Sequence, residues 1–251
     1  PYADKHYIQT AVVEAAKTAG VDLRLVGARA YSSNTLESGW IPSPLPGIYT
    51  GDGMMQQYRD WLGADSYEAM GSIGGSLVSD NIEDYYVTPF ELGYDFYIGW
   101  KKEDFIGKAA LEAMRDKANR KKVTIEWNRE DVMKVIMSCF EPGLAYKWID
   151  FPQPNYSSSN ADTLLKDGKQ VGMSMFNGYS YNERCLLSLA VVNADVQIGD
   201  VLTLLWGEPE VTGKTSIEPH KQAEIRVRVA ATPYAADARE NYADSWRTKA
   251  K

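Results

Sequence analysis

The chain has 251 residues, of which 44% are hydrophobic and 24% charged, which is enough to bury the core of one large domain or two small ones. Its formal net charge of -7 argues against the basic surface that nucleic acid or an anionic membrane requires. No apolar run reaches the roughly 20 residues of a membrane span, and no signal peptide is recognisable. We therefore expect a cytoplasmic protein with no nucleic-acid and no membrane partner.

Residues 4–18 are predicted to form a helix, because apolar side chains such as Ile8 and Val12 recur on one face at helical spacing. Asp4 can cap the start of this helix and Gly20 can end it. The first residue is Pro1 rather than Met, which suggests a fragment, a processed chain or one half of a longer polypeptide.

The alternation of Leu23 and Leu25 with polar neighbours predicts a half-buried strand up to Gly27. The stretch 39–53 holds so many prolines and glycines that we expect an ordered loop or a lid there. Two further helices are predicted, from the pattern MMQQYRDWLG and over residues 107–118.

The glycine-rich stretch GSIGGS, residues 71–76, is not followed by the GK[ST] of a phosphate-binding loop, and we interpret it as a flexible turn. The two cysteines and two histidines are scattered, so no metal site is expected. The cysteines, Cys139 and Cys185, are expected to be reduced and buried.

After Lys122 the sequence breaks into short apolar runs separated by Gly, Pro, Asn and Asp, which is typical of a barrel or a sandwich. We place a domain boundary near residue 124. The runs read as strands are VTIEW, KVIMSCF, LAYKWIDF, QVGMSMF, RCLLSLAVV, VLTLLWG and AEIRVRVAATPY.

Four segments of the chain resemble the glycine-cleavage T-protein family, and they follow one another in the same order as in the family. The most specific is TPFELGYDFYIGWKKEDFIGKAAL, residues 88–111, which is similar to the family signature TP-x-E-x-GL-x-W…DFIG-K/R-x-AL. Upstream of it, VGARAYSSNTLESG resembles the family's GLGARDSLRLEAG, a strand and turn that follow a helix. The segments DGKQVGMSMFNGYSYNERCLLSLAVV and QIGDVLTLLW…AEIRVRVAATPYAADAR resemble the strands of its C-terminal barrel.

This resemblance implies an α+β protein. Residues 1–124 would be the second part of a T-protein-like folate-binding region, and residues 125–251 a C-terminal antiparallel β-barrel domain. Tetrahydrofolate is the implied cofactor, held in a channel between these parts. The family's first half, with its GYTGE-x-G-[FY]-E segment, is not in this sequence. The N-terminal half, as a missing part or a separate chain, is therefore an expected partner.

Branches of the family differ in the carbon donor. Where the glycine-cleavage branch has Asp, this chain has Ala30 and Tyr31, followed by Trp40 and a proline-rich loop. These features and the tail residues Tyr242 and Trp246 resemble the tetrahydrofolate-dependent aryl O-demethylases of the vanillate, 3-O-methylgallate and syringate type. The resemblance implies that a small aromatic methoxy acid gives its methyl group to N5 of tetrahydrofolate, a step in the breakdown of lignin-derived aromatics.

An aryl ether is a poor methyl donor because a phenolate must leave, so a positioned proton donor should accelerate the transfer by roughly 10²–10⁴-fold. A tyrosine hydroxyl stays protonated at neutral pH and can donate to the ether oxygen. We therefore predict that Tyr31 is the catalytic acid or hydrogen-bond donor. The alternative is a tyrosine that only packs at the rim of a strand.

Three further site residues follow from the same comparison. Glu37 matches the glutamate of the LEAG-type turn, and its carboxylate suits the paired donors of a pterin. Trp40 offers a flat indole to the folate, and Arg29 could bind a substrate carboxylate. The alternatives are a capping or surface role for Glu37, a hydrophobic anchor for Trp40 and a buried ion pair for Arg29.

Two classes of function compete with O-demethylation. One is another one-carbon transfer of the same family, from an aminomethyl, sulfonium or methylamine donor. The other is a folate-binding subunit without catalysis, which is disfavoured because the KGC-[FY]-x-GQE type segment of those relatives is not in this sequence.

Overall fold

The computed structural model describes the chain except for residues 42–50, 64–65, 71–72, 153–158, 213–216 and 242–251. It separates into two compact units, residues 1–31 and 32–251, and each is described by itself. Most of the proline-rich loop and both aromatic residues of the tail, Tyr242 and Trp246, lie outside the described residues.

The first unit confirms the predicted opening helix. After a 3-10 turn, η1 (Tyr2–Asp4), the helix α1 runs over Lys5–Thr18. Asp4 occupies the N-cap position, although its side chain makes no capping hydrogen bond. At the other end Gly20 has φ +67°, and the N–H of Val21 donates to the Ala16 oxygen at 2.9 Å, which satisfies a carbonyl of the last turn.

The predicted strand at residues 23–27 is wrong. Residues 21–27 form no strand, and Leu25 is 68% exposed. An isolated strand needs a neighbour for its backbone hydrogen bonds, and no described strand pairs with this segment. The helix α2 (Ala28–Ser38) begins directly after it, where the sequence had predicted a strand and a turn.

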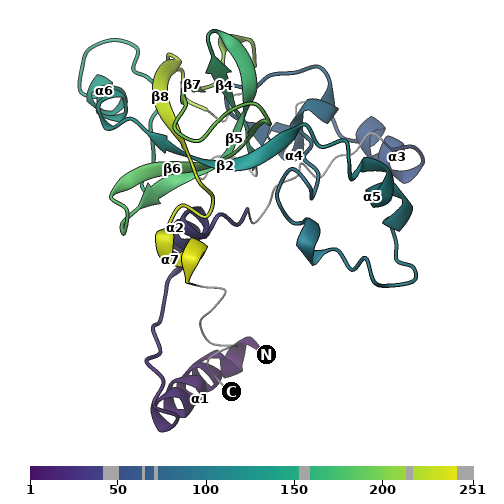
Figure 1. Ribbon diagram of the computed structural model, residues 1–251. Helices are drawn as coiled ribbons and strands as arrows, with labels where there is room; N and C mark the ends of the chain where they lie inside the picture. Colours follow the sequence, from purple (N-terminus) through teal and green to yellow (C-terminus); the bar gives the residue numbers. More distant parts are fainter. Residues whose placement is uncertain (42–50, 64–65, 71–72, 153–158, 213–216, 242–251) are drawn as a thin grey trace. The chain divides into compact units, whose positions relative to one another are not determined.

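Six antiparallel strands of the second unit form a closed barrel in the order β2-β6-β5-β4-β7-β8 (Figure 1). β2 pairs with β6 along one edge and with β8 along the other, which closes the ring. The predicted antiparallel barrel is thereby confirmed. The domain boundary near residue 124 falls within β2, and that division stays a prediction. The strands are β2 (Arg120–Trp127), β4 (Asp162–Lys166), β5 (Lys169–Ser180), β6 (Cys185–Asn193), β7 (Val201–Trp206) and β8 (Ala223–Ala230).

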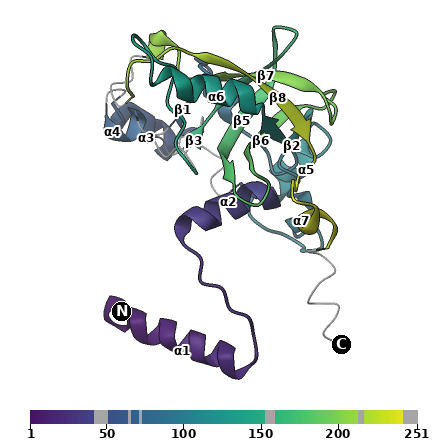
Figure 2. The same cartoon turned by 90° about the vertical axis from the view of Figure 1, so that its left-hand side faces the viewer.

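One predicted strand is a helix. The run KVIMSCF belongs to α6 (Arg129–Ser138), which lies beside β8 (Figure 1, Figure 2). The Asn128 side chain caps this helix by accepting hydrogen bonds from the N–H groups of Glu130 and Asp131. Val132 and Val135, three residues apart, bury the same face. The run LAYKWIDF forms only one bridge, between Tyr146 and Lys221.

β6 separates the two hydrophobic cores of this unit. Alternate residues of a strand point to opposite faces. Leu186, Ala190 and Val192 belong to a core with Trp127 and Trp206, whose rings meet edge to face at 5.4 Å. On the other face Leu187, Leu189 and Val191 pack with Leu36, Ile41, Leu77, Val87 and Leu92. Burial on both faces explains why this strand reads as a continuous apolar run.

The remaining elements are short. The predicted helices at MMQQYRDWLG and residues 107–118 are confirmed, although the second ends at Met114. Among the described residues no helix is both long enough and apolar enough to cross a membrane. Cys185 is half-buried, but Cys139 is exposed, because the run that holds it ends a helix rather than forming a core strand. The short elements are α3 (Met54–Trp61), α4 (Tyr67–Met70), β1 (Ile73–Gly74), η2 (Ile82–Tyr85), η3 (Asp95–Tyr97), α5 (Lys108–Met114), β3 (Ser159–Asn160), η4 (Glu210–Thr212) and α7 (Ala236–Glu240).

Candidate functional site

Three of the four predicted site residues lie on α2. Arg29 and Tyr31 belong to the first unit, and Glu37 to the second, as does Trp40, which follows the helix. The Tyr31 side chain is 54% exposed. The side chain of Arg29 is outside the described part of the structure. The predicted roles of these two residues therefore stay predictions.

Glu37 is buried and held by the turn between β5 and β6. The Asn182 amide nitrogen donates to both carboxylate oxygens, at 2.9 and 3.2 Å. The Ser180 hydroxyl donates to one of them at 2.5 Å. The sequence alternative of a surface role for Glu37 is wrong, because only 9% of the residue is exposed. The structure brings a carboxylate of fixed orientation to this end of the barrel.

The sequence analysis did not identify Asn182 and Ser180 as partners of Glu37. They lie in the stretch GYSYNER, which reads as a turn between two apolar runs. The turn residues give no sign of which side chain they bind, because Glu37 is 145 residues earlier in the chain.

Trp40 lines a pocket of about 680 Å³, within the range of small-molecule sites. Its walls include Phe90, Tyr94 and Tyr97, and Lys122 lies at its side. The Lys122 ammonium donates to the Gly39 oxygen at 2.7 Å and lies 4.4 Å from the centre of the Tyr94 ring. Burial lowers the pKa of Lys122 to about 8. The pocket thus combines aromatic walls with a cation.

The Thr88–Pro89–Phe90–Glu91 motif fixes one wall of this pocket. The buried Glu91 carboxylate accepts from the Thr88 N–H at 2.7 Å and from the Arg120 guanidinium at 2.6 and 3.1 Å. Burial alone would raise the pKa of Glu91, but the hydrogen bonds from Arg120 and Thr88 lower it below its ordinary value. Glu91 is therefore a structural carboxylate that ties the motif to the first barrel strand.

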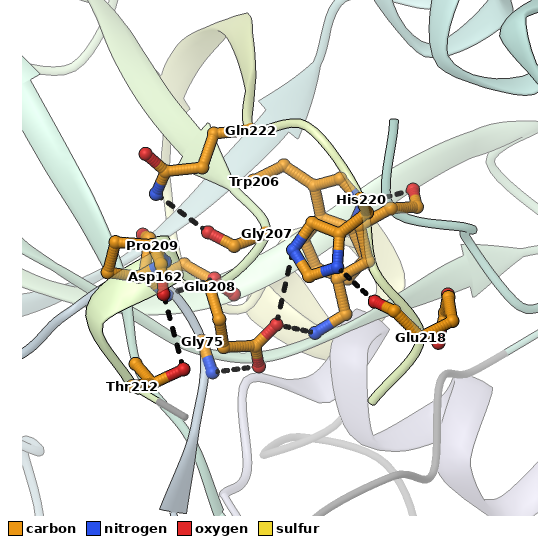
Figure 3. Close-up of polar contacts among 12 residues, drawn as sticks. Gly75, Asp162, Trp206, Gly207, Glu208, Pro209, Thr212, Glu218, His220 and Gln222 are labelled. Carbon is orange, nitrogen blue, oxygen red and sulfur yellow. Dashed lines mark hydrogen bonds and ion pairs between the residues drawn. The ribbon is translucent and has the colours of Figure 1, made fainter. Parts of the chain in front are cut away.

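A second buried polar cluster explains the glycine-rich stretch (Figure 3). The N–H of Gly75 donates to Glu208 at 2.7 Å, and the other oxygen of that carboxylate accepts from Lys147 at 2.5 Å. The N–H of Ser76 donates to Asp162 at 3.1 Å. Gly75 has φ +103°, and a Cβ there would lie 2.3 Å from the Ala161 oxygen. Residues 73–76 are thus fastened to the barrel, and the predicted flexible turn is wrong for them.

The cluster contains two buried carboxyl groups, those of Glu208 and Asp162, but only one buried ammonium group, that of Lys147. Asp162 is fully buried, and one of its oxygens has no hydrogen-bond partner among the described residues. Burial raises the pKa of Asp162 to about 7, against the opposing effects of Lys147 and the Ser76 N–H. His220 approaches Glu208 at 3.7 Å. Among the described residues no His, Cys, Asp and Glu side chains gather as a set of three metal ligands.

Comparison with known proteins places these observations in a family. The chain is 47% identical to a syringate O-demethylase of Sphingobium sp. over 251 residues, which are 99% of this chain and 54% of that protein. It is 31% identical to a sesamin methylene transferase of Sinomonas sp. over 172 residues, 62% of this chain and 35% of the relative. The chain belongs to the glycine-cleavage T-protein family. This relationship confirms the resemblance drawn from the four sequence segments.

A third, more distant relative also matches part of the chain. An aminomethyltransferase of Thermotoga neapolitana is 24% identical over 139 residues, 55% of this chain and 31% of that protein. No family model matches the chain. The chain spans about half the length of the first of these relatives and about a third of the other two.

Proposed function

We propose that the chain is part of an enzyme that transfers methyl from an aryl methyl ether to tetrahydrofolate. The carrying observation is the 47% identity to a syringate O-demethylase along the whole chain. The names of the three relatives describe different reactions: O-demethylation, methylene transfer and aminomethyl transfer. Of these three relatives, the syringate O-demethylase matches the chain with the highest identity and over the longest stretch. An aromatic methoxy acid of the syringate or vanillate type is the substrate that we propose.

The residues present fit a reduced folate. A pterin presents neighbouring N–H and NH₂ donors, and the Glu37 carboxylate is held in one orientation by Asn182 and Ser180. Trp40 offers an indole that is 44% exposed at the edge of an aromatic pocket. When bound, tetrahydrofolate would supply N5 as the methyl acceptor. The contact of Glu37 with the pterin and that of Trp40 with a folate ring are both proposals.

In the reaction the bond between the methyl carbon and the ether oxygen breaks, and a bond from that carbon to N5 forms. The departing oxygen takes a proton, and N5 releases one. We assign Tyr31 as the donor to the departing oxygen, because its hydroxyl can stabilise the phenolate as it forms. Arg29 would hold the carboxylate of the substrate, since a guanidinium pairs with it through two parallel hydrogen bonds.

The chain together with the N-terminal half that we propose as its partner provides the test. It would be incubated with tetrahydrofolate and syringate or vanillate, and 5-methyltetrahydrofolate and the phenol would be quantified. Tyr31→Phe should lower kcat by roughly 10²–10⁴-fold with little change in folate affinity. Tyr181→Phe, which changes an exposed tyrosine of the β5–β6 turn, is the matched control. Near-normal turnover of Tyr31→Phe would reject the assignment.

A comparison of two substrates tests whether Arg29 binds the substrate carboxylate. Arg29→Met should raise KM for vanillate and leave KM for guaiacol, the same ring without its carboxylate, unchanged. Equal effects on both substrates would remove Arg29 from the substrate site.

The 31% identity to a sesamin methylene transferase favours one alternative, transfer of a methylene group from a methylenedioxy ring. The two reactions leave different folates. A methylenedioxybenzene substrate that yields 5,10-methylenetetrahydrofolate, together with no product from methoxybenzoates, would establish the alternative.

A further inference from the structure

A cleft between α6 and the start of β6 is not used by the proposed reaction. Its volume is about 170 Å³. A cavity of roughly 150 Å³ holds one benzene molecule, so this cleft has room for a single six-membered ring. Its apolar lining includes the side chains of Trp127, Val132, Ile136, Phe151, Tyr179 and Leu186.

The rings in this lining have a defined arrangement. Phe151 and Tyr179 meet edge to face, with their centres 5.5 Å apart. Ile136 and Tyr179 are only partly buried, although they pack against the barrel core. The cleft therefore leaves apolar surface of the core open to a ligand.

Two arginines, Arg129 and Arg184, also line the cleft. Within the described part of the chain, neither guanidinium has a hydrogen bond or an ion pair. The barrel arginines Arg120 and Arg226 differ, because each is paired with a carboxylate. The carboxylate in the cleft, Glu126, does not offset the two charges, because it already accepts from Arg228 and from the Tyr234 hydroxyl.

Arg184 is held in an unusual backbone conformation. Its φ is +57°, a left-handed value that side chains other than glycine, Asn and Asp rarely adopt. Its N–H closes the β5–β6 turn by donating to the Ser180 oxygen at 2.9 Å. A strained residue with an unpaired charge at a cleft is a reason to look for a ligand.

We propose that this cleft binds a small aromatic carboxylate, with the ring on the apolar lining and the carboxylate between Arg129 and Arg184. The volume fits one ring, and the two guanidiniums supply the charge complement that a carboxylate requires. The lining of the cleft includes neither Glu37 nor Trp40, and the proposal stands on these contacts whether or not the proposed function holds.

The test uses the 251-residue chain with ¹³C-labelled methionine methyl groups and benzoate as the probe. Met133 lines the cleft, whereas Met54 in α3 does not. Benzoate should shift the Met133 signal in a saturable manner and leave Met54 unchanged. Benzamide, which keeps the ring but not the charge, and acetate, which keeps the charge but not the ring, should each bind at least about tenfold more weakly.

Three variants locate the ligand. Arg129→Met should weaken benzoate binding by about tenfold or more, and so should Arg184→Asn, because Asn tolerates the left-handed backbone. Lys169→Met, which removes a charge from another hairpin, should leave benzoate affinity unchanged. Arg29→Met should also leave the Met133 response intact, which separates this cleft from the proposed substrate site.

The proposal fails if Met133 does not respond, if benzamide or acetate binds as tightly as benzoate, or if neither arginine variant changes the affinity. A Met133 response lost in Arg29→Met but kept in both cleft variants would also overturn it. Failure of O-demethylation in the complete enzyme would leave each of these outcomes unchanged.

Discussion

Asn182 donates hydrogen bonds from its side-chain nitrogen to both oxygens of the Glu37 carboxylate. The relationship joins the helix α2 to the β5–β6 turn, and it fixes the direction of the buried Glu37 carboxylate, which is a proposed folate contact. The strength of this link can be measured separately from any ligand.

The first prediction concerns that link. Asn182→Leu keeps the size of the side chain but leaves a buried carboxylate with one donor fewer, so the free energy of unfolding should fall by about 1–3 kcal/mol. Urea denaturation of the chain measures this loss. Asn241→Leu, at the exposed residue that follows α7, should change stability by no more than about 0.5 kcal/mol. Equal effects of the two variants would show that the Asn182 hydrogen bonds add nothing.

The second prediction concerns the buried ion pair. Lys147 and Glu208 are both almost fully buried, so removal of one partner leaves an uncompensated charge. Lys147→Met should lower the free energy of unfolding by about 3–5 kcal/mol. The double variant Lys147→Met/Glu208→Gln should be less destabilised than Lys147→Met alone. Additive losses in a double-mutant cycle would contradict a coupled pair.

The third prediction is a dependence of stability on pH. Because burial raises the pKa of Asp162 from 3.8 to about 7, the folded state holds this proton more tightly than the unfolded state. The stability that Asp162 contributes is complete below about pH 4 and is lost as the pH rises to about 7, a change of about 2–4 kcal/mol. Asp162→Asn keeps an acceptor for the Ser76 N–H and should remove this loss.

The measurement is chemical denaturation of both proteins from pH 4 to 8. The difference between them reports Asp162 together with its coupling to Glu208 in the same cluster, whereas Glu91, whose pKa is lowered by Arg120 and Thr88, contributes equally to both. Parallel stability curves for the two proteins would show that Asp162 binds its proton equally in both states.

The fourth prediction concerns Gly75. Gly75→Ala combines a positive φ with a Cβ at 2.3 Å from a backbone oxygen, so the strand segment must shift away from Ala161. Gly168→Ala is the matched control, because Gly168 also has positive φ, at +75°, but has nothing within 4 Å of a new Cβ. Gly168→Ala should cost about 1–2 kcal/mol, and Gly75→Ala clearly more. Thermal unfolding compares them, and equal losses would mean that the close approach is relieved without cost.

The fifth prediction is that the charge of Lys122 controls ligand affinity at the Trp40 pocket. Since the pKa of Lys122 is lowered to about 8, its ammonium is progressively lost as the pH rises from 7 to 9. The affinity for p-aminobenzoylglutamate, an anionic fragment of folate, should fall across this range. Lys122→Gln should bind the fragment weakly at pH 7 and show a flat profile. A decline that persists in Lys122→Gln would assign the effect to another group.

The barrel could be predicted because its strands carry readable patterns. In β8 buried and exposed residues alternate from Ala223 to Val229, the period of a half-buried strand. β4 was missed because only Leu164 and Leu165 of its five residues are apolar, although the Asp167–Gly168 dipeptide that follows, with φ +51° and +75°, indicates a hairpin turn. The helix α6 was misread because its decisive signal, the Asn128 cap, stands before the apolar run.

The residues that we propose for the site differ in how far the sequence alone could name them. Glu37 and Trp40 could be named from local motifs, whereas Asn182 and Lys122 could not, because their partners Glu37 and Gly39 are brought to them by the barrel. A local motif can identify one residue of a contact, whereas its partner, which is distant in the sequence, becomes apparent only in the tertiary structure. The pairing of Glu91 with Arg120 shows the same separation between motif and partner.

Because the ring closes between β2 and β8, the barrel cannot be completed until its last strand has been synthesised. During synthesis β2 emerges before any other barrel strand and must wait for β8, the last, so two edges stay open to intermolecular pairing until Ala230 has been made. Expression products that stop before Ala223, or that start within β2, would keep such edges and should aggregate. A productive fragment of this protein has to carry both strands.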